Sequence, residues 1–217
     1  MDVYLERGSK RVFAGVLEWP GWCRSGRDDE AALQALVDYA PRYRAALKTA
    51  ARDFPKTVPD LVVRERLRGD ATTDFGAPGI PPKFDSAPLD DSELRRLVKI
   101  LRASWSAFDR TAAENARRSL RKGPRGGGRD VDGIVAHVYG ADKAYLARLG
   151  GSYRGDGMKE MRAALVSAIT ARAHNEPVPE NPRRKAMIWP PRYGVRRSAW
   201  HALDHAWEIE DRAQPAR

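Results

Sequence analysis

Apolar residues recur at the spacing of an α-helix in the second half of the chain, and this periodicity constrains the fold more than any other feature. An apolar residue at every third or fourth position places one apolar stripe along a helix. The pattern is clearest after Asp90, where the stripe consists of Leu94, Leu97, Leu101, Trp105, Phe108 and Ala112. It predicts a helix that continues to about residue 119.

Three more amphipathic stretches follow, over about residues 131–149, 158–169 and 194–212. Each stretch is preceded by residues that break helices. These are a Gly-rich connection over 122–129, Gly150-Gly151, and a Pro-rich connection over 176–191. Asp90 with Glu93 has the spacing of a capping box, and Asp130 is a suitable N-cap for the second stretch. Four amphipathic helices of this length predict a four-helix bundle.

The first half of the chain has a different pattern. Residues 3–19 alternate apolar and other side chains around Gly8-Ser9, which predicts a β-hairpin. Asp28 is a good N-cap for a helix over 29–50, with a break near Pro41. Leu61–Leu67 is a further strand candidate.

The stretch from Thr72 to Pro88 is rich in Gly and Pro and is the favoured domain boundary. The sequence therefore predicts an α+β protein, with a small α+β module over 1–86 and a helical bundle over 87–217.

The overall composition limits the class of protein and its compartment. No apolar run is long enough to span a bilayer, and the N-terminus lacks the apolar stretch of a signal peptide. The single cysteine, Cys23, excludes an intrachain disulfide and fits a reducing compartment. We therefore expect a cytoplasmic protein with no membrane partner. The formal net charge of +10 would attract nucleic acid or acidic small molecules, but no recognition motif accompanies it.

Three of the four histidines suggest a metal site. His201 and His205 are four residues apart, so on a helix they lie on the same face, one turn from each other. His137 lies at the edge of the apolar stripe of an earlier predicted helix. Three imidazoles from two helices would bind one ion and leave positions open for water or substrate. Such a set suits Zn²⁺, Ni²⁺ or Fe²⁺, and the affinity order does not choose among them.

A second interpretation of these histidines remains open. On a helical wheel, His201 and His205 share the polar face of their helix with Asp204 and Glu208. That face lines a groove in which the two carboxylates orient the imidazoles, or it is solvated and carries ordinary surface histidines. Glu208 as a fourth ligand is a further alternative. His137 would be satisfied equally well by a hydrogen bond in the core.

Arg196 and Arg197 lie one turn before His201 and are the candidate cations for an anionic substrate.

The first 50 residues resemble the small HicB-like fold, a short sheet backed by a helix. The likeness rests on Trp19-Pro20-Gly21 at the end of the hairpin, on Ser25-Gly26, and on Glu30-Ala31 at the start of the helix. HicB-like domains occur as antitoxins and as fused modules. The resemblance implies a fold rather than an activity.

Residues 88–213 resemble the DinB-like metal-binding four-helix bundles. The matching residues are His137 within Ile134–Val138 and the block Ala199–Arg212, which contains His201 and His205. By this resemblance the three histidines are the metal ligands. Some relatives use a low-molecular-weight thiol for isomerisation or for sulfur transfer to electrophiles. The extra N-terminal module and the short tail after the last helix depart from the family pattern and leave the substrate open.

The resemblance implies a metal-dependent transferase or isomerase that acts on a small molecule through a thiol or water nucleophile. The rival hypothesis is a non-enzymatic adaptor, in which the HicB-like module and the basic charge bind nucleic acid or a partner protein. The sequence leaves the oligomeric state open, with a homodimer as one alternative.

Overall fold

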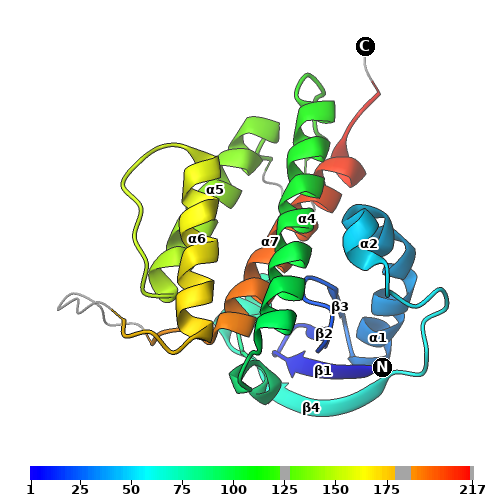
Figure 1. Cartoon of the computed structure of the whole chain (residues 1–217). Coiled ribbons are helices and arrows are strands. Elements are labelled where there is room, and N and C mark those ends of the chain that lie inside the picture. The colour runs from blue at the N-terminus through cyan, green and yellow to red at the C-terminus, as the bar shows by residue number, and fades with distance from the viewer. Residues whose placement is uncertain (123–127, 179–186, 216–217) are drawn as a thin grey trace.

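The computed structural model describes residues 1–122, 128–178 and 187–215, and these form an α+β fold (Figure 1). Residues 123–127 and 179–186, which belong to the two predicted connections, lie outside the described residues. The strands are β1 (Asp2–Arg7), β2 (Val12–Val16), β3 (Cys23–Gly26) and β4 (Val62–Arg68). No described helix is both long and apolar enough to cross a membrane.

The four strands form one mixed sheet in the order β3-β2-β1-β4. The predicted hairpin is confirmed, because β1 and β2 pair antiparallel with Val3 opposite Val16. The predicted strand near residue 62 is also confirmed, and β4 pairs parallel with β1. Strand β3 was not predicted, because its four residues, Cys-Arg-Ser-Gly, show no apolar alternation. It is held by antiparallel pairing with β2.

One face of the sheet is covered by α1 (Asp29–Asp38). Helix α2 (Ala40–Leu47) and the 3-10 turn η1 (Lys48–Ala51) follow it and pack into the same apolar cluster. The Asp28 carboxylate accepts a hydrogen bond from the Ala31 N–H, which confirms the predicted N-cap. The predicted break also occurs, with Pro41 in the first turn of α2, where its missing N–H leaves no helical bond unmade.

The opposite face of the sheet is covered by residues 69–90, which include α3 (Ala71–Phe75) and η2 (Lys83–Ser86). Glu6 of β1 is fully buried on this face, and its carboxylate accepts hydrogen bonds from the Thr73 hydroxyl and from the N–H groups of Gly79 and Ile80. The Gly- and Pro-rich stretch is therefore attached to the sheet. The division of the chain at residues 86–87 remains a prediction.

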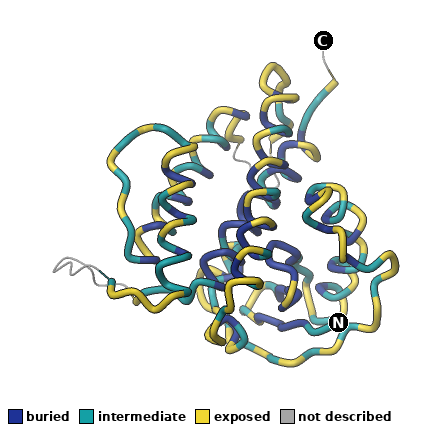
Figure 2. Tube along the Cα trace, viewed as in Figure 1, coloured by how far each residue is buried: buried dark blue, intermediate teal, exposed yellow. Residues whose placement is uncertain are grey.

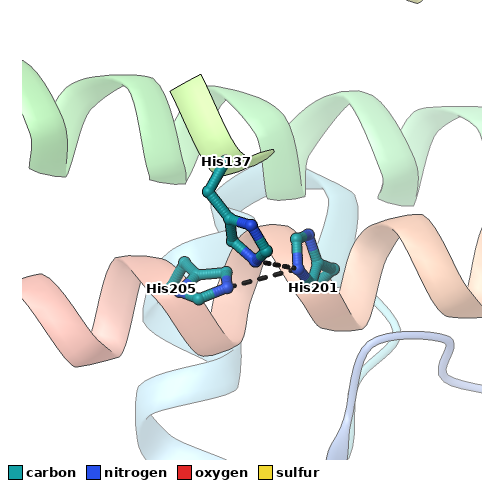
Figure 3. Close-up of side chains that lie close together, drawn as sticks. All are labelled: His137, His201 and His205. Carbon is teal, nitrogen blue, oxygen red and sulfur yellow. Dashed lines mark hydrogen bonds between the residues drawn. The ribbon is translucent and has the colours of Figure 1, made fainter. Parts of the chain in front are cut away.

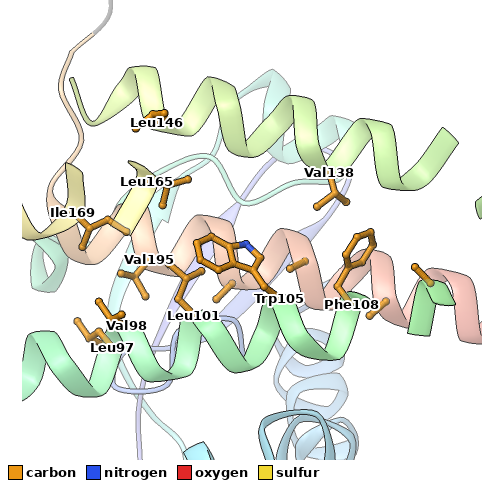
Figure 4. Close-up of a cluster of buried hydrophobic side chains, with 14 of the residues drawn as sticks. Leu97, Val98, Leu101, Trp105, Phe108, Val138, Leu146, Leu165, Ile169 and Val195 are labelled. Atoms are coloured by element: carbon orange, nitrogen blue, oxygen red, sulfur yellow. The ribbon is translucent and has the colours of Figure 1, made fainter. Parts of the chain in front are cut away.

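The second half forms four long helices, α4 (Asp91–Asn115), α5 (Val131–Arg148), α6 (Met158–Ala173) and α7 (Pro191–Arg212). Their apolar stripes meet in one cluster, shown in Figure 4, that includes Leu101, Phe108, Val138, Leu165 and Val195. Burying apolar stripes against one another is the main force that holds such helices together.

The predicted starts of α4 and α5 are correct in position, with one difference in detail, whereas α7 begins at Pro191, three residues before its predicted start. Asp90 and Asp130 each accept a hydrogen bond from a backbone N–H three residues later. The Glu93 carboxylate, however, pairs with the Arg192 guanidinium of α7. The described contacts therefore include only one half of the predicted capping box, because a long-range ion pair takes up the glutamate.

Helix α7 is central and is buried along most of its length (Figure 2). Val195 and Ala199 pack into the bundle core, whereas Leu203 and Trp207 pack into a second cluster with the sheet, α1 and α2. Ile100 and Ala107 of α4 join this second cluster. The two halves of the chain thus share α4 and α7 as a common wall.

One buried carboxylate interrupts the bundle core. Asp142 of α5 is 1% exposed, and neither of its oxygens accepts a hydrogen bond among the described residues. Its nearest cation is Arg162 of α6, whose Nε lies 3.7 Å from Oδ2. Burial raises the pKa of Asp142 to about 7. The protonated carboxyl is therefore the form that the fold favours.

We expect the free energy of unfolding of Asp142→Asn to increase relative to that of the natural protein as pH rises. Because the folded-state pKa lies above the unfolded value near 4, the stability contributed by the neutral carboxyl is complete below pH ~4 and is lost as pH rises through ~7. Asparagine does not ionise, so the difference in unfolding free energy should grow by about 4 kcal/mol between pH 4 and 8. Urea unfolding of both proteins at the two pH values measures it, and a pH-independent difference would contradict the assignment.

Candidate metal centre

The three predicted histidines meet between α5 and α7. His201 and His205 lie on consecutive turns of α7, and His137 reaches toward them from α5 (Figure 3). The Nε2 atom of His201 lies 3.2 Å from Nε2 of His137 and 3.2 Å from Nε2 of His205. One nitrogen from each of the three rings falls within 4.8 Å of the other two. This group could hold a metal ion.

The nitrogen spacing fits a shared ion. With metal–nitrogen bonds of about 2.0–2.1 Å, two ligands are about 3.3–3.4 Å apart at a tetrahedral centre and about 2.8–3.0 Å apart at adjacent octahedral positions. The observed 3.2 Å lies between these values. Both spacings around His201 are therefore compatible with neighbouring ligands at either kind of centre, which would leave its remaining positions for other groups.

The environment favours the neutral form of two of the three imidazoles, those of His201 and His137. His201 is 6% exposed, and burial is the main reason why its pKa lies well below the usual value. Burial also lowers the pKa of His137. A neutral imidazole carries one lone pair, which is what a metal ion requires. The burial of His201 rules out the alternative in which it is an ordinary solvated histidine.

The chain of contacts behind His205 fixes the tautomer of that ring. The Glu208 carboxylate lies 2.7 Å from His205 Nδ1, so Nδ1–H donates to Glu208 and the lone pair is left on Nε2. The hydrogen bond from His205 is the main reason why the pKa of Glu208 is lowered. The other Glu208 oxygen accepts a hydrogen bond from the Arg212 guanidinium. Arg212 is held in turn by the carbonyl oxygens of Arg121 and Arg129.

Two of the residues predicted around the histidines have other partners. In place of the predicted contact with an imidazole, the Asp204 carboxylate pairs with Arg24 at 2.8 Å. In place of a substrate, the Arg196 guanidinium binds both oxygens of Asp85 and the carbonyl oxygens of Val16 and Leu17. Both differences have the same cause. The sheet and residues 69–90 cover the side of α7 that carries Arg196 and Asp204, and the sequence did not predict this contact.

Arg197 has the position predicted for a cation near the site. Its guanidinium lies 5.6 Å from the centre of the Tyr145 ring and 4.7 Å from that of Trp200, and its Nη1 has no hydrogen-bond partner. The Tyr145 ring is 5.8 Å from the His201 ring. Neither Tyr145 nor Arg212 was predicted to belong to the site, because an aromatic residue in an apolar stripe and an arginine at a helix end carry no signal of such a role.

Comparisons with known proteins give no match: no family model, no curated protein and no solved structure corresponds to this chain.

Glu208→Gln should weaken transition-metal binding by about 10–100-fold, which is the usual effect of removing a partner that orients a histidine ligand. Glutamine preserves the size of the side chain but can present an N–H to His205, which disfavours the required tautomer. Competition with a chromogenic chelator measures the affinity. Asp204→Asn is the matched control, since Asp204 pairs with Arg24 instead, and it should leave the affinity unchanged. Equal losses in the two variants would contradict the role of Glu208.

Proposed function

We propose that the protein is a metal-dependent enzyme whose ion is held by His137, His201 and His205. The observation that supports it is the convergence of three Nε2 atoms, with 3.2 Å between neighbours, in a partly buried place. When bound there, a divalent transition metal lowers the pKa of a water or thiol and stabilises developing negative charge. Zn²⁺, Ni²⁺ and Fe²⁺ all suit a site of three nitrogens.

The side chains around the ion would position the substrate. The Nη1 atom of Arg197 has no hydrogen-bond partner, and the nearest compensating charge is that of the buried Glu6 carboxylate, on which Arg197 acts without a direct contact. An anionic group of the substrate would bind at this guanidinium. Tyr145 retains its phenolic proton because burial raises its pKa, and its hydroxyl is available as a donor to a substrate atom beside the histidines. Glu208 and Arg212 would keep His205 in the binding tautomer.

The DinB-like resemblance adds a reaction class to this proposal. The proposal is supported by four described helices in the second half of the chain and by a histidine cluster carried on α5 and α7. The class that the resemblance implies is transfer or isomerisation with a low-molecular-weight thiol, or with water as the nucleophile. The HicB-like module would then support α7 by packing against it. We expect the protein to be cytoplasmic.

The direct test is activity of metal-loaded protein toward two model substrates. Consumption of a small thiol by chlorodinitrobenzene reports thiol transfer, and release of nitrophenol from nitrophenyl acetate reports attack by water. We expect metal-dependent turnover in one of the two assays, and its loss in His137→Ala. His174→Ala is the control, because His174 follows the end of α6, is exposed and pairs with Asp91 of α4.

Turnover that survives in His137→Ala, or the absence of turnover in both assays with metal bound, would contradict this function. Salt-sensitive binding of RNA or DNA that is unchanged by His137→Ala, together with absent turnover, would favour the adaptor hypothesis instead.

A further inference from the structure

A cavity of about 190 Å³ lies at the β3 edge of the sheet, against α7. Its walls come from the sheet, from Gly76 at the end of α3, and from Trp200 and Asp204 of α7. The volume equals that of about six water molecules at ~30 Å³ each. It therefore suits a ligand with few heavy atoms.

Two of the residues that line the cavity carry buried hydrogen-bond donors without acceptors. The Trp200 side chain is 4% exposed, and its indole N–H has no partner. Arg11 at the start of β2 is half-buried, its Nε has no partner, and no carboxylate pairs with it among the described residues. A buried donor without an acceptor destabilises the fold, so such groups in a cavity indicate where an acceptor can bind.

The charged side chains that line the cavity have a net positive charge. Arg24 and Asp204 both line it and neutralise each other through their ion pair at 2.8 Å. Arg11 is then the uncompensated charge. Cys23 adds no negative charge, because burial raises the pKa of its thiol to about 12. The cavity as a whole is therefore complementary to a small anion.

We propose that this cavity is a binding site for a small oxyanion, a carboxylate or a phosphate. The guanidinium of Arg11 presents paired N–H groups that match two oxygens of such an ion, and the Trp200 indole N–H is a further donor. The site is separate from the histidines and does not depend on the proposed metal chemistry. Because the Trp200 ring lies 6.1 Å from the His201 ring, an occupied cavity would contact the helix turn that carries His201.

The test is titration of ¹⁵N-labelled full-length protein, stripped of metal with a chelator, at constant ionic strength. The chain has six tryptophans, and Trp200→Phe identifies the indole N–H signal of Trp200. Inorganic phosphate is added in one arm and lactate in the other. We expect a saturable shift of the Trp200 signal in at least one arm, and the arm that responds identifies the kind of oxyanion.

Arg11→Gln should weaken this binding about tenfold, as expected for loss of a charge-assisted hydrogen bond. Arg11→Lys retains the charge but not the paired N–H groups, and its affinity for the anion should lie between those of the natural protein and Arg11→Gln. Arg27→Gln is the matched control, because it makes the same charge change at a side chain that is 90% exposed and already paired with Asp28. It should bind like the natural protein.

Three results would overturn the proposal. One is a shift that stays linear in both arms, which indicates general ionic effects. Another is unchanged affinity in Arg11→Gln. The third is binding that appears only after a transition metal is added, because the anion would then occupy the histidine site. The same titration of His137→Ala should give the natural affinity, whether or not the protein proves to be a metalloenzyme.

Discussion

Replacing His201 by alanine should abolish transition-metal binding while leaving the fold intact. His201 Nε2 is the atom within 3.2 Å of both other ligand nitrogens, so its loss leaves two nitrogens from different helices. The affinity should fall by more than the ~10–100-fold that loss of an orienting partner causes. Elemental analysis of untagged protein should give one equivalent of metal for the natural chain and almost none for the variant.

Two controls make this result specific to the site. His174→Ala removes the one histidine outside the cluster and should retain a full equivalent of metal. Circular dichroism should show unchanged helix content in His201→Ala, because alanine is compatible with the middle of α7. A full equivalent of metal in folded His201→Ala would disprove the assignment of the ligands.

Replacing Asp85 by alanine should destabilise the protein by about 3–5 kcal/mol, because it leaves the Arg196 charge buried without its partner. Asp85 is fully buried and Arg196 is 5% exposed, and their two hydrogen bonds are 2.7 and 2.8 Å long. Arg196 also binds the carbonyl oxygens at the end of β2, so this pair connects η2, the sheet and α7. Urea unfolding followed by circular dichroism measures the loss.

The comparison for this prediction is an ion pair at the surface. Arg64 and Asp2 pair at 2.9 Å with side chains that are 58% and 41% exposed, and Arg64→Gln should cost about 0.5 kcal/mol or less. Asp85→Asn retains the shape of the side chain without its charge and serves if Asp85→Ala does not fold. A loss below ~1 kcal/mol in both Asp85 variants would show that Arg196 finds another partner or water.

The helices and their starting points could be predicted from the sequence because the signals are local. Asp28, Asp90 and Asp130 each cap a backbone N–H three residues later, and the apolar stripe from Leu94 to Ala112 needs only the helix period. The hairpin is local in the same sense. The His201–His205 spacing is likewise a property of one helix.

The partners of the charged residues could not be predicted, because they depend on which faces of α7 the sheet covers. Arg196 and Asp85 are 111 positions apart, and Arg24 and Asp204 are 180 apart. A helical wheel gives Asp204 and Glu208 similar positions near the histidines. In the fold, Glu208 contacts His205 and Asp204 faces Arg24 of β3. Strand β3 itself exists because of pairing with β2 rather than because of its own sequence.

The central claim is that Nε2 atoms from α5 and α7 bind one and the same ion. A crystal of the metal-loaded protein, measured above and below the absorption edge of the metal, tests this most directly. We expect one anomalous peak about 2.0–2.1 Å from Nε2 of His137, His201 and His205. A peak bound elsewhere, or one that contacts His201 and His205 while His137 points away, would contradict the account.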